Sequence, residues 1–308
     1  MSSQYMRNCI DAARVSDDSS TTQSQVDRED IMELGASLHH LHLTSPDPQR
    51  LADFYARTHG LQTVAKGERW VCAAPGRTLV LSAGPANALA HAAFGFADAD
   101  RWQAFRAKAQ GRATEPVPAL PVACEDALAA RDPDGNLVVF MLRPGVPAGV
   151  PARDELPAAH LQHFALRTTD PAAMLAFYEG ELGFTLSDRV QDGEGTLRAC
   201  FLRTEHLHHA LALFRAPKPG FDHQSFETTG WNEMKTWGDH MAAVKETIVW
   251  GIGRHGPGDD VFFMVRDPDG NLAEISAEIE VCAPDRPVGI WPHEERTLNV
   301  WGKAIMRD

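Results

Sequence analysis

The sequence predicts an α+β protein built from two tandem modules, each made of paired βαβββ units. Two observations predict this fold: a turn-and-strand motif that occurs twice, and a strand-and-helix opening that also occurs twice. The motif reads Arg-Asp-Pro-Asp-Gly-Asn-Leu, at residues 131–137 and again at residues 266–272. A motif that recurs with the same residues, at the same place in the order of elements, indicates an internal duplication. Because short strands alternate with helices, curved and mostly antiparallel sheets are expected.

The first module is expected over residues 34–143. It opens with a strand, and Pro46-Asp47-Pro48 then begins a helix that Gly60 ends. Two short strands, a second βα unit and the repeated turn with its strand follow. The expected elements lie at residues 38–44, 51–59, 70–73, 78–82, 91–111 (with the helix at 102–109) and 137–142.

The second module is expected over residues 158–282 and repeats the first. Residues 161–171 match residues 38–48 at an offset of 123, whereas the later turn matches at an offset of 135. The second copy has therefore gained about 12 residues in between.

Three segments are expected to lie outside the modules. Residues 1–33 are rich in Ser, Thr, Gln and Asp and are interpreted as a mobile N-terminal extension. Residues 144–157 are rich in Pro, Gly and Ala and are interpreted as a linker. Residues 283–308 form a C-terminal tail, and Trp291 and Trp301 are expected to hold it against the body.

Composition narrows the class of function. The chain has 308 residues, a net charge of −13 and a pI of about 5.5, without a long basic run, so neither nucleic acid nor an anionic membrane is expected as a partner. The first 20 residues lack an apolar core segment, so no export signal is expected, and no apolar stretch has membrane-spanning length. The five cysteines are scattered and are expected to be free thiols of a cytoplasmic protein.

The two copies of the motif differ at a position that matters chemically. Eight residues after its arginine, the second copy has Glu274 where the first has Val139. In the same module His163 and His223 lie on strand-like segments with alternating apolar positions. Singly, each has an ordinary explanation, as an exposed strand carboxylate or a hydrogen-bonded histidine. Together, two imidazoles and one carboxylate are the ligand set of non-haem Fe(II) sites that keep open positions.

Five segments in order carry a resemblance to a known family: residues 162–167, 176–184, 208–212, 222–227 and 253–274. Over about residues 37–280 the chain resembles the two-module extradiol ring-cleavage dioxygenases of the vicinal oxygen chelate superfamily. The resemblance implies a C-terminal catalytic module in which His163, His223 and Glu274 bind Fe(II), with Mn(II) as an alternative. It also implies aromatic catabolism, with a small catechol-like aromatic and O₂ as substrates, and a homo-oligomer.

The same resemblance implies roles for further residues. His209 falls on the family's acid/base histidine, and a histidine beside the oxygen position can take up and return a substrate proton. His206 and His208 are expected as its neighbours on one strand, with His208 facing the opposite side. His255 falls on a substrate-contacting histidine. Arg254 is interpreted either as a solvent-exposed residue or as a clamp for a substrate anion.

One position departs from the family pattern. Many members carry a tyrosine nine residues after the histidine that matches His255, and here that residue is Met264. Loss of a buried phenol removes a hydrogen bond worth about 1–3 kcal/mol. Asp259 or Asp260 is a candidate replacement, without a basis for choosing between them. The substrate class is therefore less constrained than the ligand set.

The first module is expected to bind no metal. It keeps His40 opposite His163, within a cluster that includes His39 and His42, but it lacks the carboxylate. Two alternatives to ring cleavage stay open: another metal-dependent enzyme of the superfamily that acts on a different chelating substrate, or a protein that sequesters a ligand. A helical segment at residues 231–241 is expected either to pack in the core or to line an aromatic pocket.

Overall fold

The computed structural model describes residues 33–124, 126–143 and 156–307. The extension predicted over residues 1–33 and the linker predicted over residues 144–157 lie almost entirely outside these described residues. No helix of the described chain is long and apolar enough to cross a membrane. The four described cysteines are free thiols, as predicted.

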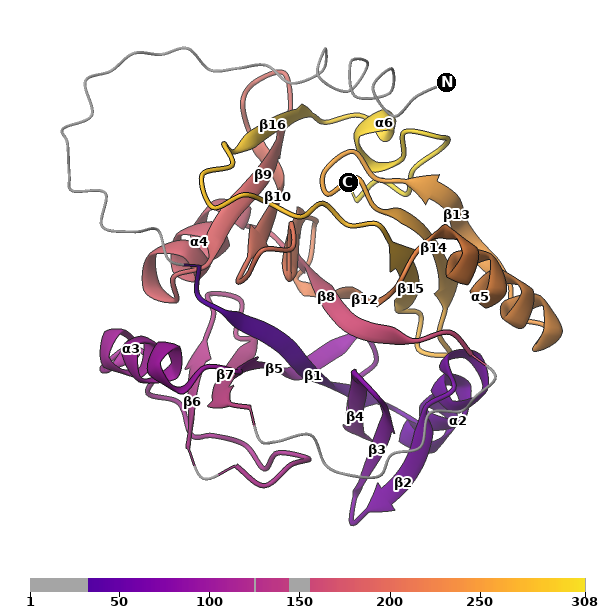
Figure 1. The fold of residues 1–308 in the computed structure, drawn as a ribbon, viewed down its shortest axis with the longest axis horizontal. Coiled ribbons are helices and arrows are strands. Elements are labelled where there is room, and N and C mark those ends of the chain that lie inside the picture. The colour runs from indigo at the N-terminus through magenta and orange to yellow at the C-terminus, as the bar shows by residue number, and fades with distance from the viewer. Residues whose placement is uncertain (1–32, 125, 144–155, 308) are drawn as a thin grey trace.

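The first module is a seven-stranded sheet in the order β2-β3-β4-β1-β5-β7-β6, drawn in indigo to purple in Figure 1. The antiparallel pair β1–β5 joins its two halves. The elements are β1 (Ala36–Ser45), α2 (Pro48–His59), β2 (Gln62–Lys66), β3 (Arg69–Ala74), β4 (Arg77–Ala83), β5 (Ala88–Phe96), α3 (Ala99–Ala109), β6 (Ala127–Arg131) and β7 (Leu137–Leu142).

The second module is a nine-stranded sheet in the order β13-β14-β15-β12-β8-β11-β10-β9-β16, with the antiparallel pair β8–β12 at its centre. Its first-half elements are β8 (Ala159–Thr168), α4 (Pro171–Ala176), η1 (Phe177–Glu181), β9 (Thr185–Gln191), β10 (Leu197–Arg203) and β11 (Leu211–Arg215). The remaining elements are β12 (Gly220–Thr228), α5 (Trp231–Ala243), β13 (Ile248–Arg254), β14 (Val261–Arg266), β15 (Leu272–Ala277), β16 (Gly289–Pro292) and α6 (Glu295–Leu298).

The predicted α+β fold with tandem modules is confirmed, with one difference in the first module. Its second unit has two strands after α3 instead of three, and between α3 and β6 only the isolated bridge between Glu115 and Ala129 forms. That segment contains Pro116, Pro118 and Pro121. Because proline has no backbone N–H to donate to a ladder, the segment cannot complete a regular strand.

The helix that follows each opening strand begins in the same way. The side chain of Asp47 accepts a hydrogen bond from Arg50 N at 3.1 Å, and that of Asp170 accepts one from Ala173 N at 3.1 Å. A proline stands in the first turn after each aspartate, where its missing N–H is not needed. The helix α2 ends at Gly60, which adopts the left-handed conformation at φ 66°.

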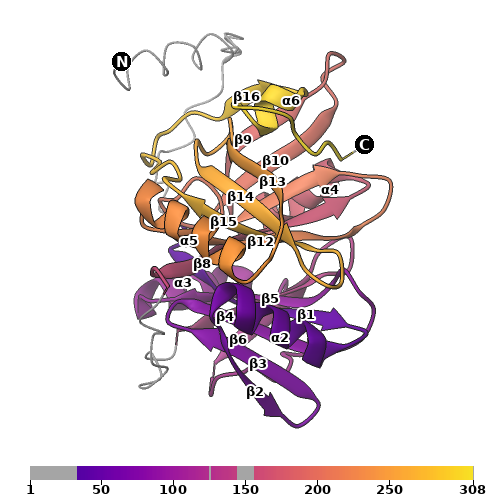
Figure 2. The ribbon, with the colours of Figure 1, turned by 90° about the vertical axis from the view of Figure 1, so that its right-hand side faces the viewer.

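The repeated turns also connect the two modules, which Figure 2 shows stacked on one another. The hydroxyl of Tyr55, in α2, donates to Oδ2 of Asp267, in the turn of the second module, at 2.9 Å. Reciprocally, the hydroxyl of Tyr178 donates to Oδ2 of Asp132, in the turn of the first module, at 2.9 Å. Both tyrosines are fully buried. Each module therefore supplies one donor and one acceptor to the interface between them.

The tail packs on the second module as expected. Strand β16 pairs in parallel with β9 at the edge of the nine-stranded sheet, which Figure 1 shows in yellow beside β9. Trp291 in β16 is buried, and its Nε1 donates to Oδ2 of Asp188 at 2.7 Å. Trp301 stays 43% exposed and packs edge-on against Trp231 of α5.

Candidate metal centre

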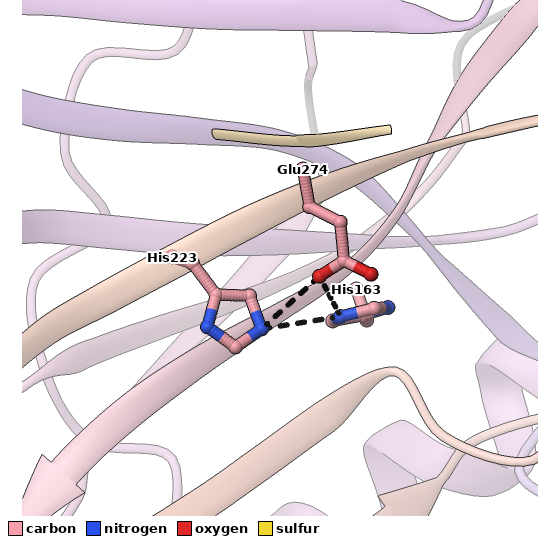
Figure 3. A group of neighbouring side chains, drawn as sticks. All are labelled: His163, His223 and Glu274. Atoms are coloured by element: carbon pink, nitrogen blue, oxygen red, sulfur yellow. Dashed lines mark hydrogen bonds and ion pairs between the residues drawn. The ribbon is translucent and has the colours of Figure 1, made fainter. Parts of the chain in front are cut away.

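Three side chains meet on one face of the nine-stranded sheet (Figure 3). His163 comes from β8, His223 from β12 and Glu274 from β15, three strands that are neighbours in the sheet. The two Nε2 atoms are 3.3 Å apart, and each is 3.6 Å from Oε2 of Glu274. Ligand atoms held about 2.1 Å from one metal ion lie roughly 3.0–3.4 Å apart. The 3.3 Å separation lies within this range and the two 3.6 Å separations lie just above it, so the three atoms are close enough to share a single ion after a small adjustment.

Two bulges orient the histidines. The β8–β12 ladder skips Gln162 just before His163, and it skips Asp222 just before His223. A bulge places successive side chains near one another instead of on opposite faces. Accordingly, Nδ1–H of His163 donates to Oε1 of Gln162, and Nδ1–H of His223 donates to Oδ1 of Asp222 at 2.7 Å. Because these bonds engage Nδ1 of both rings, Nε2 is in each case the nitrogen left to bind a metal.

Glu274 is a buried carboxylate without hydrogen bonds. Its side chain is fully buried, and neither oxygen has a hydrogen-bond partner in the described part of the chain. Burial alone would raise its pKa, but His163 and His255 hold that pKa well below its usual range. A charge buried in this way is costly without a cation beside it. The residues present therefore fit a divalent metal ion.

His209 lies beside this triad, but not on a strand. The strand predicted through His206, His208 and His209 is wrong, because these residues form the loop between β10 and β11. Its closest ring contact in the triad is His163, with centroids 4.3 Å apart. Burial holds the pKa of His209 well below its usual range. Because His208 and His209 lie in a loop, their imidazoles can contact each other. On a strand, successive side chains would point to opposite faces.

A chain of buried polar contacts lies behind His209. Nδ1 of His208 lies 3.0 Å from Nδ1 of His209, and Nε2 of His208 lies 3.1 Å from Oδ2 of Asp188. Asp188 is fully buried and also contacts Arg286 at 2.9 Å. Because Nδ1 of His209 faces His208, Nε2 is the nitrogen left available to a ligand. His208 was expected to face away from the site, and it supports the site instead.

His255 approaches the triad from the end of β13. Its Nε2 lies 3.7 Å from Oε1 of Glu274, and its ring stacks on Phe262 with centroids 3.7 Å apart. Its Nδ1–H donates to the carbonyl of Leu298 in the tail. Burial alone would lower the pKa of His255, but the carboxylates of Asp260 and Glu274 outweigh burial and raise it. His255 is thus placed as a hydrogen-bond donor.

A pocket opens beside the triad histidines, with about 350 Å³ of empty space that includes space open to solvent. Its walls are largely aromatic and apolar, and they include Met264, which pairs directly with Glu274 across the β14–β15 ladder. The lining residues are His163, Phe201, His209, Ala212, Phe214, His223, Trp250, His255, Pro257, Met264, Leu298 and Arg307. Residues 231–241 contribute none of them. Trp237 and Met241 are buried in the hydrophobic core, so core packing is confirmed for these two residues, whereas Trp231 is 45% exposed and lies outside both the core and the pocket.

The structure does not bring Arg254 and Asp259 to this cavity. Arg254 binds Glu278 at 2.8 Å and lies over Trp301 at 5.4 Å. Asp259 is half exposed and pairs with Arg254 at 3.3 Å. Asp260, the other candidate, is fully buried next to His255, and burial raises its pKa to about 7.

Sequence reasoning missed Arg307. Its guanidinium contacts both oxygens of Asp222, at 2.7 and 3.2 Å, and lies over Phe214 at 4.5 Å. Burial alone would raise the pKa of Asp222, but Arg307 and His223 hold it well below its usual range. The tail therefore contributes to the site as well as to the sheet. A lone arginine 33 residues after Glu274 gave no pattern from which this could have been predicted.

Comparison with known proteins shows which proteins this chain resembles. Residues 160–275, which span the triad, match the family model of the Glyoxalase/Bleomycin resistance protein/Dioxygenase superfamily. The matched residues lie within the second module, and the match agrees with the resemblance predicted from the sequence.

The relatives narrow the resemblance to ring-cleaving dioxygenases. Metapyrocatechase 2 of Cupriavidus necator is 32% identical over 195 residues, which cover 56% of this chain and 60% of that protein. Biphenyl-2,3-diol 1,2-dioxygenase of Paraburkholderia xenovorans is 30% identical over 152 residues, covering 48% and 49%. The chain thus spans about half to three fifths of the length of these curated relatives.

Solved structures agree with the fold. A variant of homoprotocatechuate 2,3-dioxygenase from B. fuscum in complex with HPCA superposes with a TM-score of 0.72 at 25% identity, covering 86% of this chain and 78% of that one. The Mn(II)-bound glyoxalase from Novosphingobium aromaticivorans also has a TM-score of 0.72, at 21% identity, covering 88% and 92%. Both share the fold of this chain.

Proposed function

We propose that this protein is an extradiol dioxygenase, a metal-dependent enzyme that uses O₂ to cleave the ring of a catechol-like aromatic. The observation that carries the proposal is the buried triad of His163, His223 and Glu274 beneath an aromatic-walled cavity, flanked by His209 and His255. Two imidazoles and one carboxylate leave coordination positions for a chelating diol and for O₂. The curated relatives named above support the same reaction class.

The proposed metal is Fe(II), with Mn(II) as the alternative that the same ligands accept. The unpartnered oxygens of Glu274 support a divalent ion at this point. When bound, the ion would supply Lewis acidity and a route for electrons between the aromatic ring and O₂. His163 and His223 would hold it through Nε2, because their Nδ1 atoms are already engaged.

The remaining residues have distinct proposed tasks. His209 is neutral and buried beside His163, so its Nε2 can take a proton from a substrate hydroxyl and return it later. The His208–Asp188 pair behind it stabilises the imidazole in that orientation. His255 can donate a hydrogen bond to a substrate oxygen. The aromatic walls favour a planar apolar ring and exclude water.

Met264 favours a second candidate, another metal-dependent reaction of the superfamily on a different chelating substrate. Its thioether stands directly beside Glu274 and offers only a weak acceptor where a phenol could donate. The described tyrosines, Tyr55 and Tyr178, are both committed to the contacts between modules. A ligand-sequestering protein, the third alternative, gives no reason for the unpartnered carboxylate of Glu274.

The test uses the full-length protein loaded anaerobically with Fe(II) and mixed with a panel of catechols. Ring cleavage predicts O₂ consumption together with a yellow ring-fission product. Glu274→Gln should lose both the metal and the activity, whereas Glu278→Gln, at an exposed carboxylate, should keep both. Bound iron without O₂ consumption on any catechol would refute ring cleavage and favour the second candidate. A protein that binds no metal would favour sequestration.

Cellular location and assembly are part of the proposal. We expect a cytoplasmic homo-oligomer that serves the breakdown of aromatic compounds. Cell fractionation and analytical ultracentrifugation test these two expectations independently of activity.

A further inference from the structure

The lining of the pocket separates into a polar end and an apolar remainder. The polar end consists of the four histidines already described. Among the described residues, the other lining side chains are apolar with one exception, which is Arg307. The apolar ones are Phe201, Ala212, Phe214, Trp250, Pro257, Met264 and Leu298. The surroundings of Arg307 therefore decide which charged groups the apolar part of the pocket accepts.

Arg307 is paired with a carboxylate that faces it from β12. The side chains of Arg307 and Asp222 are only 7% and 8% exposed. Nη2 of Arg307 donates to Oδ1 of Asp222 at 2.7 Å, and Nε donates to Oδ2 at 3.2 Å. Two parallel N–H groups thus bind the carboxylate in the bidentate way that suits a guanidinium. The edge of Arg307 that could bind a substrate carboxylate is therefore already occupied.

The other groups of the guanidinium also have partners. Nη1 donates to the carbonyl of Ile305 at 2.8 Å. The guanidinium carbon lies 4.5 Å from the ring centroid of Phe214 and 5.2 Å from that of Trp250. An aromatic face attracts a cation, and these two faces already have one. A positively charged substrate group would meet Arg307 there instead of an unoccupied ring face.

The ion pair is fixed in place by its neighbours. Asp222 also accepts the Nδ1–H of His223 at 2.7 Å. A second arginine, Arg167, approaches Asp222 at 3.8 Å, but it does not line the pocket. Its side chain is 34% exposed and its Nη2 donates to the carbonyl of Phe221. Because water screens an exposed charge, Arg167 changes the balance at the pocket wall little.

We propose that the pair of Arg307 and Asp222 makes this wall electrically neutral, so that the pocket selects catechols whose ring substituents are uncharged. The inference rests on the proposed function, since the diol of the substrate would occupy the end that carries the triad. A carboxylate or an ammonium group on the ring would then be buried without an opposite charge, which is costly. Either charge should weaken binding by about 100-fold relative to a neutral group of the same size.

The test compares three catechols that differ in the charge of one short side chain. Homoprotocatechuate carries a carboxylate, its amide is uncharged, and dopamine carries an ammonium group. Each is titrated calorimetrically into the full-length protein, loaded with Fe(II), without O₂ at pH 7. The amide should bind about 100-fold more tightly than either charged compound.

The other outcomes of this titration are distinct. If homoprotocatechuate binds as tightly as its amide, Arg307 is an unbalanced cation. If dopamine does so, Asp222 is an unbalanced anion, and either result overturns the proposal. Admitting O₂ afterwards tests the reaction separately. Tight binding of the amide without ring cleavage would support the neutral wall and refute the dioxygenase, whereas binding of none of the three would overturn both.

A variant tests whether the ion pair sets this preference. Asp222→Asn removes the negative charge, while the amide oxygen of asparagine can still accept the Nδ1–H of His223. Arg307 would then be unbalanced, so the preference for the amide over homoprotocatechuate should fall by about 10-fold or more. Asp239→Asn, the same change at an exposed position of α5, should leave the preference unchanged.

An unchanged preference in folded, iron-loaded Asp222→Asn would overturn the role of the pair. If that variant does not fold or does not hold iron, the comparison of homoprotocatechuate with dopamine in the unchanged protein decides. A neutral wall requires that both charged compounds bind more weakly than the amide, whereas an unbalanced Arg307 or Asp222 would favour one of them.

Discussion

Replacing Tyr55 by phenylalanine is expected to destabilise the protein more than the matching change at Tyr178. Both hydroxyls donate to an aspartate of the other module at 2.9 Å. The hydroxyl of Tyr55 also accepts a hydrogen bond from Nε2 of Gln224 at 2.6 Å, whereas the hydroxyl of Tyr178 has no second hydrogen bond within the described residues. The two positions therefore form a matched pair that differs by one hydrogen bond.

The magnitudes follow from the partners. A hydrogen bond to a charged group contributes about 1.5–3 kcal/mol, and a neutral one about 0.5–1.5 kcal/mol. Tyr178→Phe, which removes one bond to a carboxylate, should lower the free energy of unfolding by about 2 kcal/mol. Tyr55→Phe should lower it by about 3 kcal/mol, because the buried amide of Gln224 loses its partner as well.

Equilibrium urea unfolding at pH 7 measures the difference. With an m value of about 3 kcal/mol/M, the two midpoints should differ by about 0.3 M, with Tyr55→Phe the lower. Adding Gln224→Met to Tyr55→Phe removes the stranded amide and should recover about 1 kcal/mol. Equal losses at Tyr55 and Tyr178, or a larger loss at Tyr178, would refute the reasoning.

Two further predictions concern buried carboxylates near the site. Burial alone would raise the pKa of Asp188, but His208 and Arg286 hold it at about 2. Since the unfolded pKa is about 3.9, this stabilisation of about 2.5 kcal/mol is complete above pH ~4 and is lost as the pH falls towards ~2. In urea titrations, Asp188→Asn should have a lower free energy of unfolding than the unchanged protein at pH 7, and that free energy should fall less as the pH is lowered. An equal fall in both proteins would contradict this. Arg307→Ala should weaken Mn²⁺ binding by about 10- to 100-fold, because Asp222 then holds its ligand histidine less firmly. Arg307→Lys should restore part of the Mn²⁺ affinity. If calorimetric titrations give Arg307→Ala the same Mn²⁺ affinity as the unchanged protein, Arg307 does not support the metal site.

The repeated turn made the fold predictable from sequence. Pro and Gly at fixed places in the turn, followed by apolar alternation, specify local structure that survives without knowledge of the rest of the chain. Because the turn occurs twice with the same residues, the presence of two modules could be inferred directly. The difference between Val139 and Glu274 then indicated which module carries the triad.

The bulges mark the limit of that reasoning. Strict alternation places Gln162 and His163 on opposite faces, and likewise Asp222 and His223, so the contacts at Nδ1 could not be predicted. Whether a strand bulges depends on its partner strand, which a pattern along one segment does not reveal.

Long-range packing set the other limit. Arg307 reaches the site only because β16 adds to the edge of the sheet and returns the tail over the cavity. His208 reaches Asp188 only because residues 204–210, between β10 and β11, form a loop and not a continuous strand. Neither contact is specified by nearby residues. Both follow from the arrangement of the complete sheet.

The reciprocal pairs between modules also bear on the ancestry of the chain. Tyr55 with Asp267 and Tyr178 with Asp132 are the contacts that two identical subunits would make across a twofold axis. A symmetric dimer of single-module ancestors, later fused, accounts for this pattern. In such a dimer a change at a ligand position alters both sites at once. In a fused chain the two positions can differ, as Val139 and Glu274 do.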